Sequence, residues 1–156
     1  MYKCFIYMNV EEKIKSTVDL APKQRTIIHL SLICNSINDQ LNKALKAFDV
    51  SIEQFNVLRI LRGQKGVAIA MKDINERMVS KMSNTTRLVD KLVNKRFVTR
   101  NICPENRRKM EILITDLGAS QLQQMDMVIE QTHSKILEEL SDVDIQTLNT
   151  LLNKFN

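Results

Sequence analysis

The chain has 156 residues, of which 44% are hydrophobic and 26% are charged, values typical of one compact globular domain with an added association segment. Three Gly, two Pro and no Trp argue against an all-β fold and against aromatic platforms for base stacking, and no apolar run reaches the roughly 18 residues that a membrane-spanning helix needs. The net charge of +5 is modest, so its distribution along the chain is more informative than its size.

Residues 1–21 are expected to form an N-terminal extension. They contain no apolar region of secretory length followed by a small-residue cleavage site, and we therefore expect a cytoplasmic protein. The three cysteines, Cys4, Cys34 and Cys103, are then expected to be reduced thiols rather than a disulfide framework.

The first long element is a helix predicted over residues 22–48. Pro22 suits a first helical turn, and the apolar positions recur at spacings of three and four along a narrow stripe, namely Ile27, Leu30, Cys34, Ile37, Leu41, Leu45 and Phe48. A helix of this length is expected to pack against a partner chain as well as its own. Cys34 is expected to pack in this stripe as a small apolar residue, where burial would lower its reactivity.

Two short helices follow. Ser51 and Gln54 have the spacing of a capping box and open a helix whose inward side chains include Phe55, Leu58 and Leu61. Gly63 and Gly66 are expected to end that helix, residues 67–69 suggest a short strand, and residues 72–78 a second helix.

A basic helix is predicted next, beginning after Ser83 as its N-cap and ending near Lys95. Its inner face is expected to carry Thr85, Leu88, Val89 and Leu92, and its outer face Asn84, Arg87, Lys91 and Asn94. Residues 97–102 and 110–114 then alternate between apolar and polar around the turn-forming residues 103–108, which predicts a β-hairpin. Further helices are expected from Thr115 and from Ser141.

The positive charge is concentrated in these elements. Residues 71–110 contain eleven basic and four acidic residues, so they carry +7 while the rest of the chain carries −2. A polyanion-binding face requires such a local excess. A short helix, a turn, a basic helix and a hairpin, in this order, predict a mainly α winged helix-turn-helix that binds double-stranded DNA.

The residue types suggest how the DNA would be contacted. Asn84 and Arg87 lie near the start of the basic helix, where such helices meet base edges in the major groove. Lys91 and Lys95 lie further along and suit phosphates. Arg107 and Arg108 at the hairpin tip suit the adjacent minor groove.

Other interpretations remain open at this stage. Arg87 could be a solvated charge paired with Asp90, and Asn84 could serve only as a helix cap. The basic hairpin could also bind an acidic protein within a helical association module. An enzyme is disfavoured, because His29 and His133 stand far apart and no glycine-rich loop or metal-ligand cluster occurs. The sequence therefore predicts no catalytic residues, no cofactor and no metal.

Five segments resemble the MarR family of bacterial transcription regulators: SIEQFNVLRIL, INERMVSKMSNTTRLVDKLVNKRFVTR, PENRRKMEILIT, DLGASQL and LSDVDIQTLNTLLNKF. With the first long helix, the resemblance covers residues 22–156. It implies a homodimer in which residues 22–50 and 116–156 are dimerisation helices and residues 51–115 are the winged DNA-binding region.

The resemblance also implies a function and a site. It implies binding to a pseudo-palindromic operator, with repression relieved by a small phenolic or other anionic effector. Because some members of the family sense oxidants through a cysteine near the first helix, the resemblance also raises an oxidant-sensing regulator acting through Cys34 as an alternative. The implied DNA contacts are Ser83, Asn84, Thr86 and Arg87, with Arg107 and Arg108 in the wing. Two departures stand out: Arg96 replaces the usual Gly after the recognition helix, and Asn106 replaces the usual Asp before the basic pair of the wing.

Overall fold

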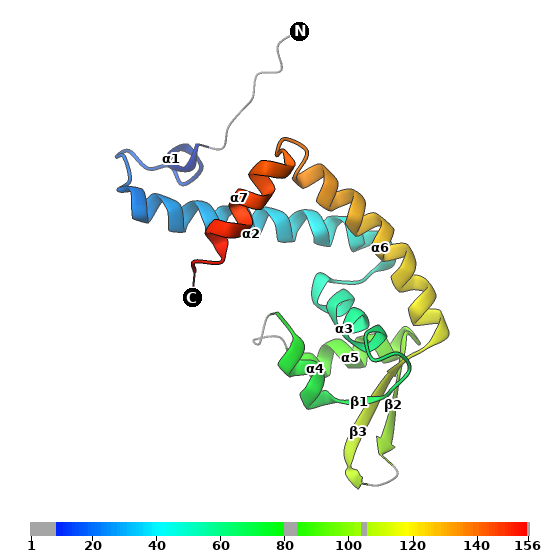
Figure 1. The fold of residues 1–156 in the computed structure, drawn as a ribbon. Helices are drawn as coiled ribbons and strands as arrows, with labels where there is room; N and C mark the ends of the chain where they lie inside the picture. Colours follow the sequence, from blue (N-terminus) through cyan, green and yellow to red (C-terminus); the bar gives the residue numbers. More distant parts are fainter. Residues whose placement is uncertain (1–8, 80–83, 104–105, 156) are drawn as a thin grey trace. The chain divides into compact units, whose positions relative to one another are not determined.

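The computed structural model describes residues 9–79, 84–103 and 106–155, without the side chains of residues 103 and 106–109. The chain divides into two compact units, residues 1–39 and 40–156, which are treated separately below. In chain order (Figure 1) the elements are α1 (Val10–Lys13), α2 (Pro22–Leu45), the 3₁₀ helix η1 (Lys46–Phe48), α3 (Ile52–Arg62), β1 (Ile69–Ala70), α4 (Met71–Arg77), α5 (Thr85–Asn94), β2 (Val98–Cys103), β3 (Asn106–Ile114), α6 (Asp116–Ile136) and α7 (Asp142–Leu152).

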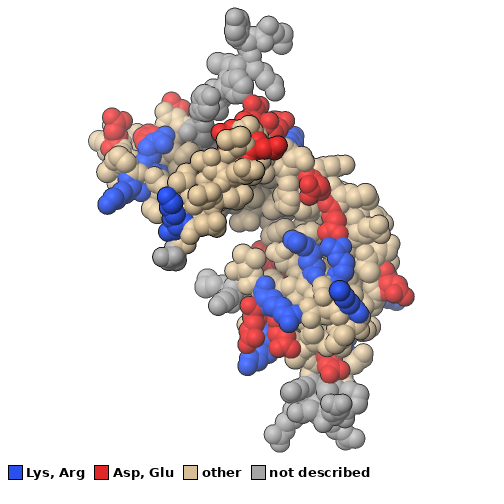
Figure 2. Space-filling view, in the orientation of Figure 1, with Lys and Arg blue, Asp and Glu red and all other residues tan. Residues whose placement is uncertain are grey.

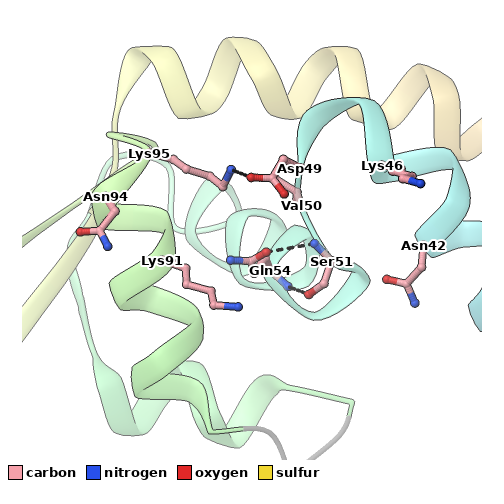
Figure 3. A pocket seen from close by; sticks show the side chains of 9 residues that line it. All are labelled: Asn42, Lys46, Asp49, Val50, Ser51, Gln54, Lys91, Asn94 and Lys95. Carbon is pink, nitrogen blue, oxygen red and sulfur yellow. Dashed lines mark hydrogen bonds and ion pairs between the residues drawn. The ribbon is translucent and has the colours of Figure 1, made fainter.

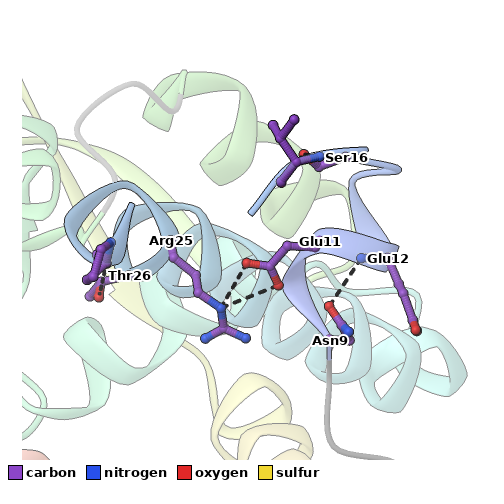
Figure 4. Close-up of polar contacts among 8 residues, drawn as sticks. Asn9, Glu11, Glu12, Ser16, Arg25 and Thr26 are labelled. Carbon is purple, nitrogen blue, oxygen red and sulfur yellow. Dashed lines mark hydrogen bonds and ion pairs between the residues drawn. The ribbon is translucent and has the colours of Figure 1, made fainter. Parts of the chain in front are cut away.

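The first unit contains a helical turn that the sequence patterns did not predict. Asn9 caps α1 by accepting a hydrogen bond from the backbone N–H of Glu12 at 3.2 Å. Glu11 then forms an ion pair with Arg25 of α2, with 3.0 Å between Oε1 and Nε (Figure 4). Because α1 has only four residues, its periodicity is too short to be recognised, yet the cap and the ion pair fix it beside α2.

The long helix ends earlier than the apolar stripe predicts. α2 stops at Leu45 and continues as η1, after which Asp49 takes a left-handed conformation with φ of 52°. Leu41 and Leu45 are buried, whereas Ile27 is 59% exposed. Cys34 is also exposed, so the expectation that it packs in the core is wrong for the single chain. The apolar stripe of α2 is buried by this chain only near its C-terminal end.

The core of the second unit lies between α3, α4, α5, the sheet and the first half of α6 (Figure 1). The sheet is antiparallel with strand order β1-β3-β2, and it pairs Ile69 with Ile112 and Val98 with Ile114. The largest fully buried side chains of this core come from all these layers, and include Phe55, Leu58, Leu61, Ile74, Val89, Leu92, Ile112, Leu122 and Met125. The predicted mainly α fold with a β-hairpin wing is confirmed.

The helix starts follow the predicted caps closely. Ser51 and Gln54 form a reciprocal capping box at the start of α3. Thr115 caps α6 by accepting from the N–H of Gly118 at 2.9 Å. Leu117, expected on the apolar side, is 48% exposed. Gly118 faces the backbone of Phe97, and adjacent helical residues point about 100° apart, so Leu117 is directed away from that contact.

The wing has a shorter turn than predicted. Residues 106–108, expected in the turn, belong to β3, which starts at Asn106. The register passes from Ile102 paired with Met110 to Cys103 paired with Asn106, so the ladder continues across a shift in register. The strands therefore stay paired despite unequal residue numbers. In the part of the chain that the structure describes, no helix is long and apolar enough to cross a membrane.

Candidate nucleic-acid interface

The start of α5 is fixed by Asn84. Its side-chain oxygen accepts a hydrogen bond from the backbone N–H of Arg87 at 3.2 Å. Ser83, predicted to be this cap, lies outside the described residues, and the structure assigns the N-cap position to Asn84 instead. Ser and Asn cap helices about equally well, so the sequence alone did not separate these neighbours. Since Oδ1 already serves the cap, a bidentate adenine contact by Asn84 would use the same oxygen twice.

The inner face of α5 holds the helix in place. Val89 and Leu92 are fully buried, and Thr85 is 6% exposed. The Thr85 hydroxyl donates to the side-chain oxygen of Asn75 in α4 at 2.8 Å. This bond joins the two helices of the helix-turn-helix and therefore fixes which face of α5 points outward. The sequence predicted Thr85 on the inner face but gave no sign of this bond.

The outward face of α5 presents Thr86, Arg87 and Lys91 to solvent. The alternative that Arg87 pairs with Asp90 is wrong, because Asp90 Oδ1 lies 2.7 Å from Nη1 of Arg100 in β2. Among the described residues the Arg87 side chain has no acidic partner. Its charge is therefore available to a polyanion.

Lys95 differs from Lys91 although both lie on the same helix end. Its ammonium group lies 2.5 Å from Oδ2 of Asp49 and its side chain is 25% exposed. The hydrogen bond and charge of Lys95 lower the pKa of the Asp49 carboxyl group, and Lys91 adds a smaller lowering effect. Lys95 is thus occupied within the chain, and a phosphate would compete with Asp49 for it.

Arg96 ends the helix in an unusual way. Its φ is 61°, the left-handed conformation that Gly adopts most easily. The N–H of Arg96 donates to the carbonyl of Val93 at 2.8 Å, and the N–H of Phe97 donates to that of Leu92 at 3.0 Å. These two bonds form a Schellman motif, with Leu92 and Phe97 both buried beneath it. The chain therefore keeps the helix end that a Gly would make, with Arg in the strained position.

The wing follows directly from this helix end. Thr115, at the end of β3, donates its hydroxyl to the carbonyl of Arg96 at 2.7 Å. The backbone of Arg107 and Arg108 lies in β3, whereas their side chains lie outside the described part of the structure. Helix and wing are thus joined at their base by a direct hydrogen bond.

The charges around α5 are more mixed than the sequence count suggests. Figure 2 shows acidic and basic side chains side by side on one face of the winged region. The ion pairs of this region explain the mixing, and they join Lys72 with Glu76, Arg100 with Asp90, and Lys95 with Asp49. Part of the local positive excess is therefore neutralised internally, and Arg87 and Lys91 provide the unpaired charge of α5.

Two pockets lie near these elements. One, of about 580 Å³, lies between η1, the start of α3 and the end of α5 (Figure 3), and is lined by polar residues that include Lys46, Asp49, Gln54 and Lys91. The other, of about 860 Å³, lies between α3 and α6, and is lined by residues that include Phe55, Arg59 and Ile129. No group of His, Cys, Asp or Glu suited to a metal ion occurs among the described residues.

A helix-turn-helix with an outward basic face, followed by a β-hairpin, defines the winged helix-turn-helix class of proteins. The model of the MarR family matches residues 50–110. The uncharacterized HTH-type transcriptional regulator YpoP of Bacillus subtilis is 30% identical over 124 residues, covering 80% of this chain and 83% of that protein. The chain belongs to the MarR family and is a transcriptional regulator. Its relatives are regulators of transcription and not enzymes, which confirms the expectation that this chain is not an enzyme.

Two further relatives and two solved structures agree with this assignment. The multiple antibiotic resistance protein MarR of Escherichia coli is 28% identical over 146 residues, covering 90% of this chain and 98% of that protein. The HTH-type transcriptional repressor IacR of Pseudomonas putida is 23% identical over 123 residues, covering 79% of this chain and 72% of that protein. The structure of apo E. coli MarR superimposes with a TM-score of 0.69 at 25% sequence identity, covering 88% of this chain and 98% of that chain. The C80S mutant of E. coli MarR in complex with operator DNA superimposes with a TM-score of 0.72 at 24% sequence identity, covering 94% of this chain and 98% of that chain.

Proposed function

We propose that this protein is a homodimeric repressor that binds a pseudo-palindromic operator and releases it when a small effector binds. The observation that carries the DNA-binding part is Arg87, which is exposed on the outer face of α5 and has no acidic partner among the described residues. Within a winged helix-turn-helix, that face of that helix enters the major groove.

We assign the DNA contacts by position on α5 and the wing. Arg87 reads a base, because a guanidinium can donate two hydrogen bonds to guanine. Thr86 is exposed beside it and can donate to a base or a phosphate, and Asn84 contributes its amide N–H₂ group while its oxygen caps the helix. The phosphate and wing contacts of the proposal are Ser83, Lys91, Lys95, Arg107 and Arg108. Of the two lysines, Lys95 contributes less because Asp49 holds it.

The homodimer is supported by the apolar side chains that the single chain leaves exposed. α7 has no buried residue. Large apolar side chains are exposed on α7 and on the residues just before and after it, namely Leu137, Leu140, Val143, Leu148, Leu151, Leu152 and Phe155. So many large exposed apolar groups mark an association surface. We propose that residues 22–50 and 116–156 supply the dimer interface and that residues 51–115 bind DNA.

Repression and operator binding are supported by the relatives. One relative is named as a repressor, and one similar structure contains operator DNA. Two winged regions related by a two-fold axis match a site with two inverted half-sites about one helical turn apart.

The experiment is selection of bound duplexes from a random pool at near-physiological salt, with unlabelled non-specific DNA as competitor. Salt matters because phosphate contacts alone weaken steeply as it rises. Enrichment of a two-fold-symmetric site is the expected result. A folded, dimeric protein that enriches no site would contradict the proposal and would favour an acidic protein as the partner of the basic face.

A further inference from the structure

The wing is joined to α5 by a side-chain ion pair. Oδ1 of Asp90 in α5 lies 2.7 Å from Nη1 of Arg100 in β2, and the two side chains are 53% and 31% exposed. The Nε atom of Arg100 is buried, so the guanidinium group lies against the protein rather than in solvent. The pair therefore links the helix that is proposed to read bases with the strand that leads to the tip of the wing.

Arg100 occupies a place on β2 where charged residues are uncommon. It pairs with Ile112 of β3 in the antiparallel register, and side chains directly opposite in such a register lie on the same face of the sheet. Ile112 is fully buried, and Val98, which precedes Arg100 by two residues and shares its face, is 2% exposed. Arg100 thus lies on the core-facing side of the sheet. A charged group needs a partner there, and Asp90 is that partner.

Beyond Arg100 the rest of the chain gives the wing little support. Ile102, the next residue of β2 on this face, is 58% exposed. Among the described residues of β2, Arg100 is the outermost one whose side chain bonds to another element, and β1 pairs with β3 only as far as Glu111. Figure 1 shows β2 and β3 pointing away from the helices past this level. The direction of the wing is therefore determined near Arg100.

We propose that Asp90 and Arg100 are positioning residues for DNA recognition. Their ion pair fixes the angle between α5 and the wing, so that both elements reach adjacent grooves of one site together. This inference rests on the proposed function, which places Arg87 against a base and assigns Arg107 and Arg108 to the wing contacts. Groups that bind a ligand must be held within about 0.5 Å and 10–20° of their productive geometry. A wing that turns about the level of Arg100 moves its tip beyond that range.

A role of these residues through their charge alone makes a different prediction. Asp90 carries a negative charge on the same helix as Arg87 and Lys91, and DNA phosphates attract positive charge. If charge were the only effect, Asp90→Asn would bind every duplex more tightly and Arg100→Met would bind every duplex more weakly. If the pair positions the wing, both variants lose the same base preference although their net charges change in opposite directions.

The first test measures the wing in the DNA-free, full-length protein. Residual dipolar couplings of the backbone amides report the order of residues 101–102 and 110–111 relative to α5. In the wild type we expect these wing amides to be as ordered as α5, with an order parameter of about 0.85. In Asp90→Asn and in Arg100→Met we expect it to fall below about 0.6.

A matched control separates the loss of the link from the loss of a charge. Glu76→Gln removes the same charge as Asp90→Asn, but from an ion pair with Lys72 that lies within α4, so it should keep the wild-type wing. All these variants should remain folded, because the Asp90 side chain is more than half exposed and an ion pair of this kind adds little to global stability.

The second test repeats the duplex selection with the same proteins. For the wild type we expect preferred bases at the positions read by α5 and at the adjacent minor-groove positions. Asp90→Asn and Arg100→Met should each lower the affinity ratio between the selected site and a site altered at the adjacent positions by about fivefold or more. The preference at the base read by Arg87 should remain. The double variant should lose no more than either single variant, because the same link is removed in all three.

The outcomes separate this inference from the proposed function. A wing that keeps its order in Asp90→Asn, or tighter binding by Asp90→Asn with every base preference intact, overturns the inference and leaves the DNA proposal standing. A wild-type protein that selects a site without any preference at the adjacent positions also overturns it. If the wild type selects no site, the proposed function fails, and the couplings of the DNA-free protein still decide whether the ion pair orients the wing.

Discussion

Arg96 shows how one residue can carry strain without changing the fold. A left-handed conformation costs a residue other than Gly about 1 kcal/mol or more. Arg96 nevertheless has a φ of 61°, because the two Schellman bonds at this helix end, where Leu92 and Phe97 are buried, require it. The helix end is therefore determined by the buried neighbours of Arg96 rather than by Arg96 itself.

We expect Arg96→Gly to stabilise the protein. The substitution removes the left-handed strain of the folded state, which raises the free energy of unfolding. Gly is more flexible in the unfolded chain, which offsets part of this effect, and a net increase of about 0.5 kcal/mol remains. Urea unfolding at constant m-value measures it. The control is Asn94→Gly, at an ordinary helical position of the same turn, which should lose about 1 kcal/mol. A loss of stability in Arg96→Gly would show that the side chain contributes more than the strain costs.

Gly118 is a second position where the backbone geometry restricts the type of residue, because the backbone of Phe97 lies too close for a side chain. A Cβ atom there would lie 2.0 Å from the carbonyl oxygen of Phe97, so α6 could not reach the base of the wing. Gly118→Ala should therefore lower the free energy of unfolding by about 3 kcal/mol or more. Gly63→Ala is the matched control, because its Cβ would lie 3.4 Å from the nearest backbone oxygen. Equal stability of the two variants, measured by thermal unfolding, would argue against this close contact.

Residue-scale predictions from sequence succeeded where the signal is local. The capping box of Ser51 and Gln54 needs only two residues at a fixed spacing, and it is confirmed. The pairing of Asp90 could not be read in the same way. Arg87 is three residues away on the same helix, but the partner is Arg100 on the next strand, and only the fold brings that strand alongside.

At the scale of elements, two lysines at the end of α5 have the same charge and different surroundings, Lys91 in the last turn and Lys95 at the C-cap. Lys91 is exposed on the outer face, and Lys95 is held by Asp49. We expect Lys91→Gln to weaken binding to all duplexes similarly and to lower the slope of log affinity against log salt by about 1. Lys95→Gln should have a smaller effect on both, since part of its charge is already neutralised. Fluorescence anisotropy with two unrelated duplexes at several salt concentrations measures this, and equal losses in both variants would refute the distinction.

The predicted elements agree with the structure where periodicity extends over several turns or strands. Both short helices, the basic helix, the hairpin and the last two helices were expected near their observed bounds. The helix α1 was not predicted because four residues define no period. The wing turn was predicted too long because a shift in register lets Asn106 pair with Cys103. The bounds of such short elements depend on contacts with residues far away in the sequence, and the local pattern of apolar and polar residues does not contain these contacts.

At the scale of the whole molecule, the exposed apolar residues of α7 predict the dimer. Leu151 is 51% exposed in the single chain, and in the proposed dimer it becomes buried in both copies. Leu151→Glu should weaken the dimer about a hundredfold or more, because two apolar contacts are lost and two charges are introduced. Asn149→Glu adds the same charge at an exposed polar position of α7 and should leave the dimer unchanged. Sedimentation equilibrium measures both, and a Leu151→Glu dimer as tight as the wild type would place the interface elsewhere.

The central claim is that the outward face of α5 reads DNA sequence through Arg87. The most direct measurement repeats the duplex selection with Arg87→Ala and with Lys72→Ala, a control on α4 whose side chain is 84% exposed. Arg87→Ala should remain dimeric and lose about 1–3 kcal/mol of discrimination at one base position in each half-site, while other positions and the control keep the wild-type preference. An Arg87→Ala protein that selects the wild-type site with unchanged preference at every position would contradict this account.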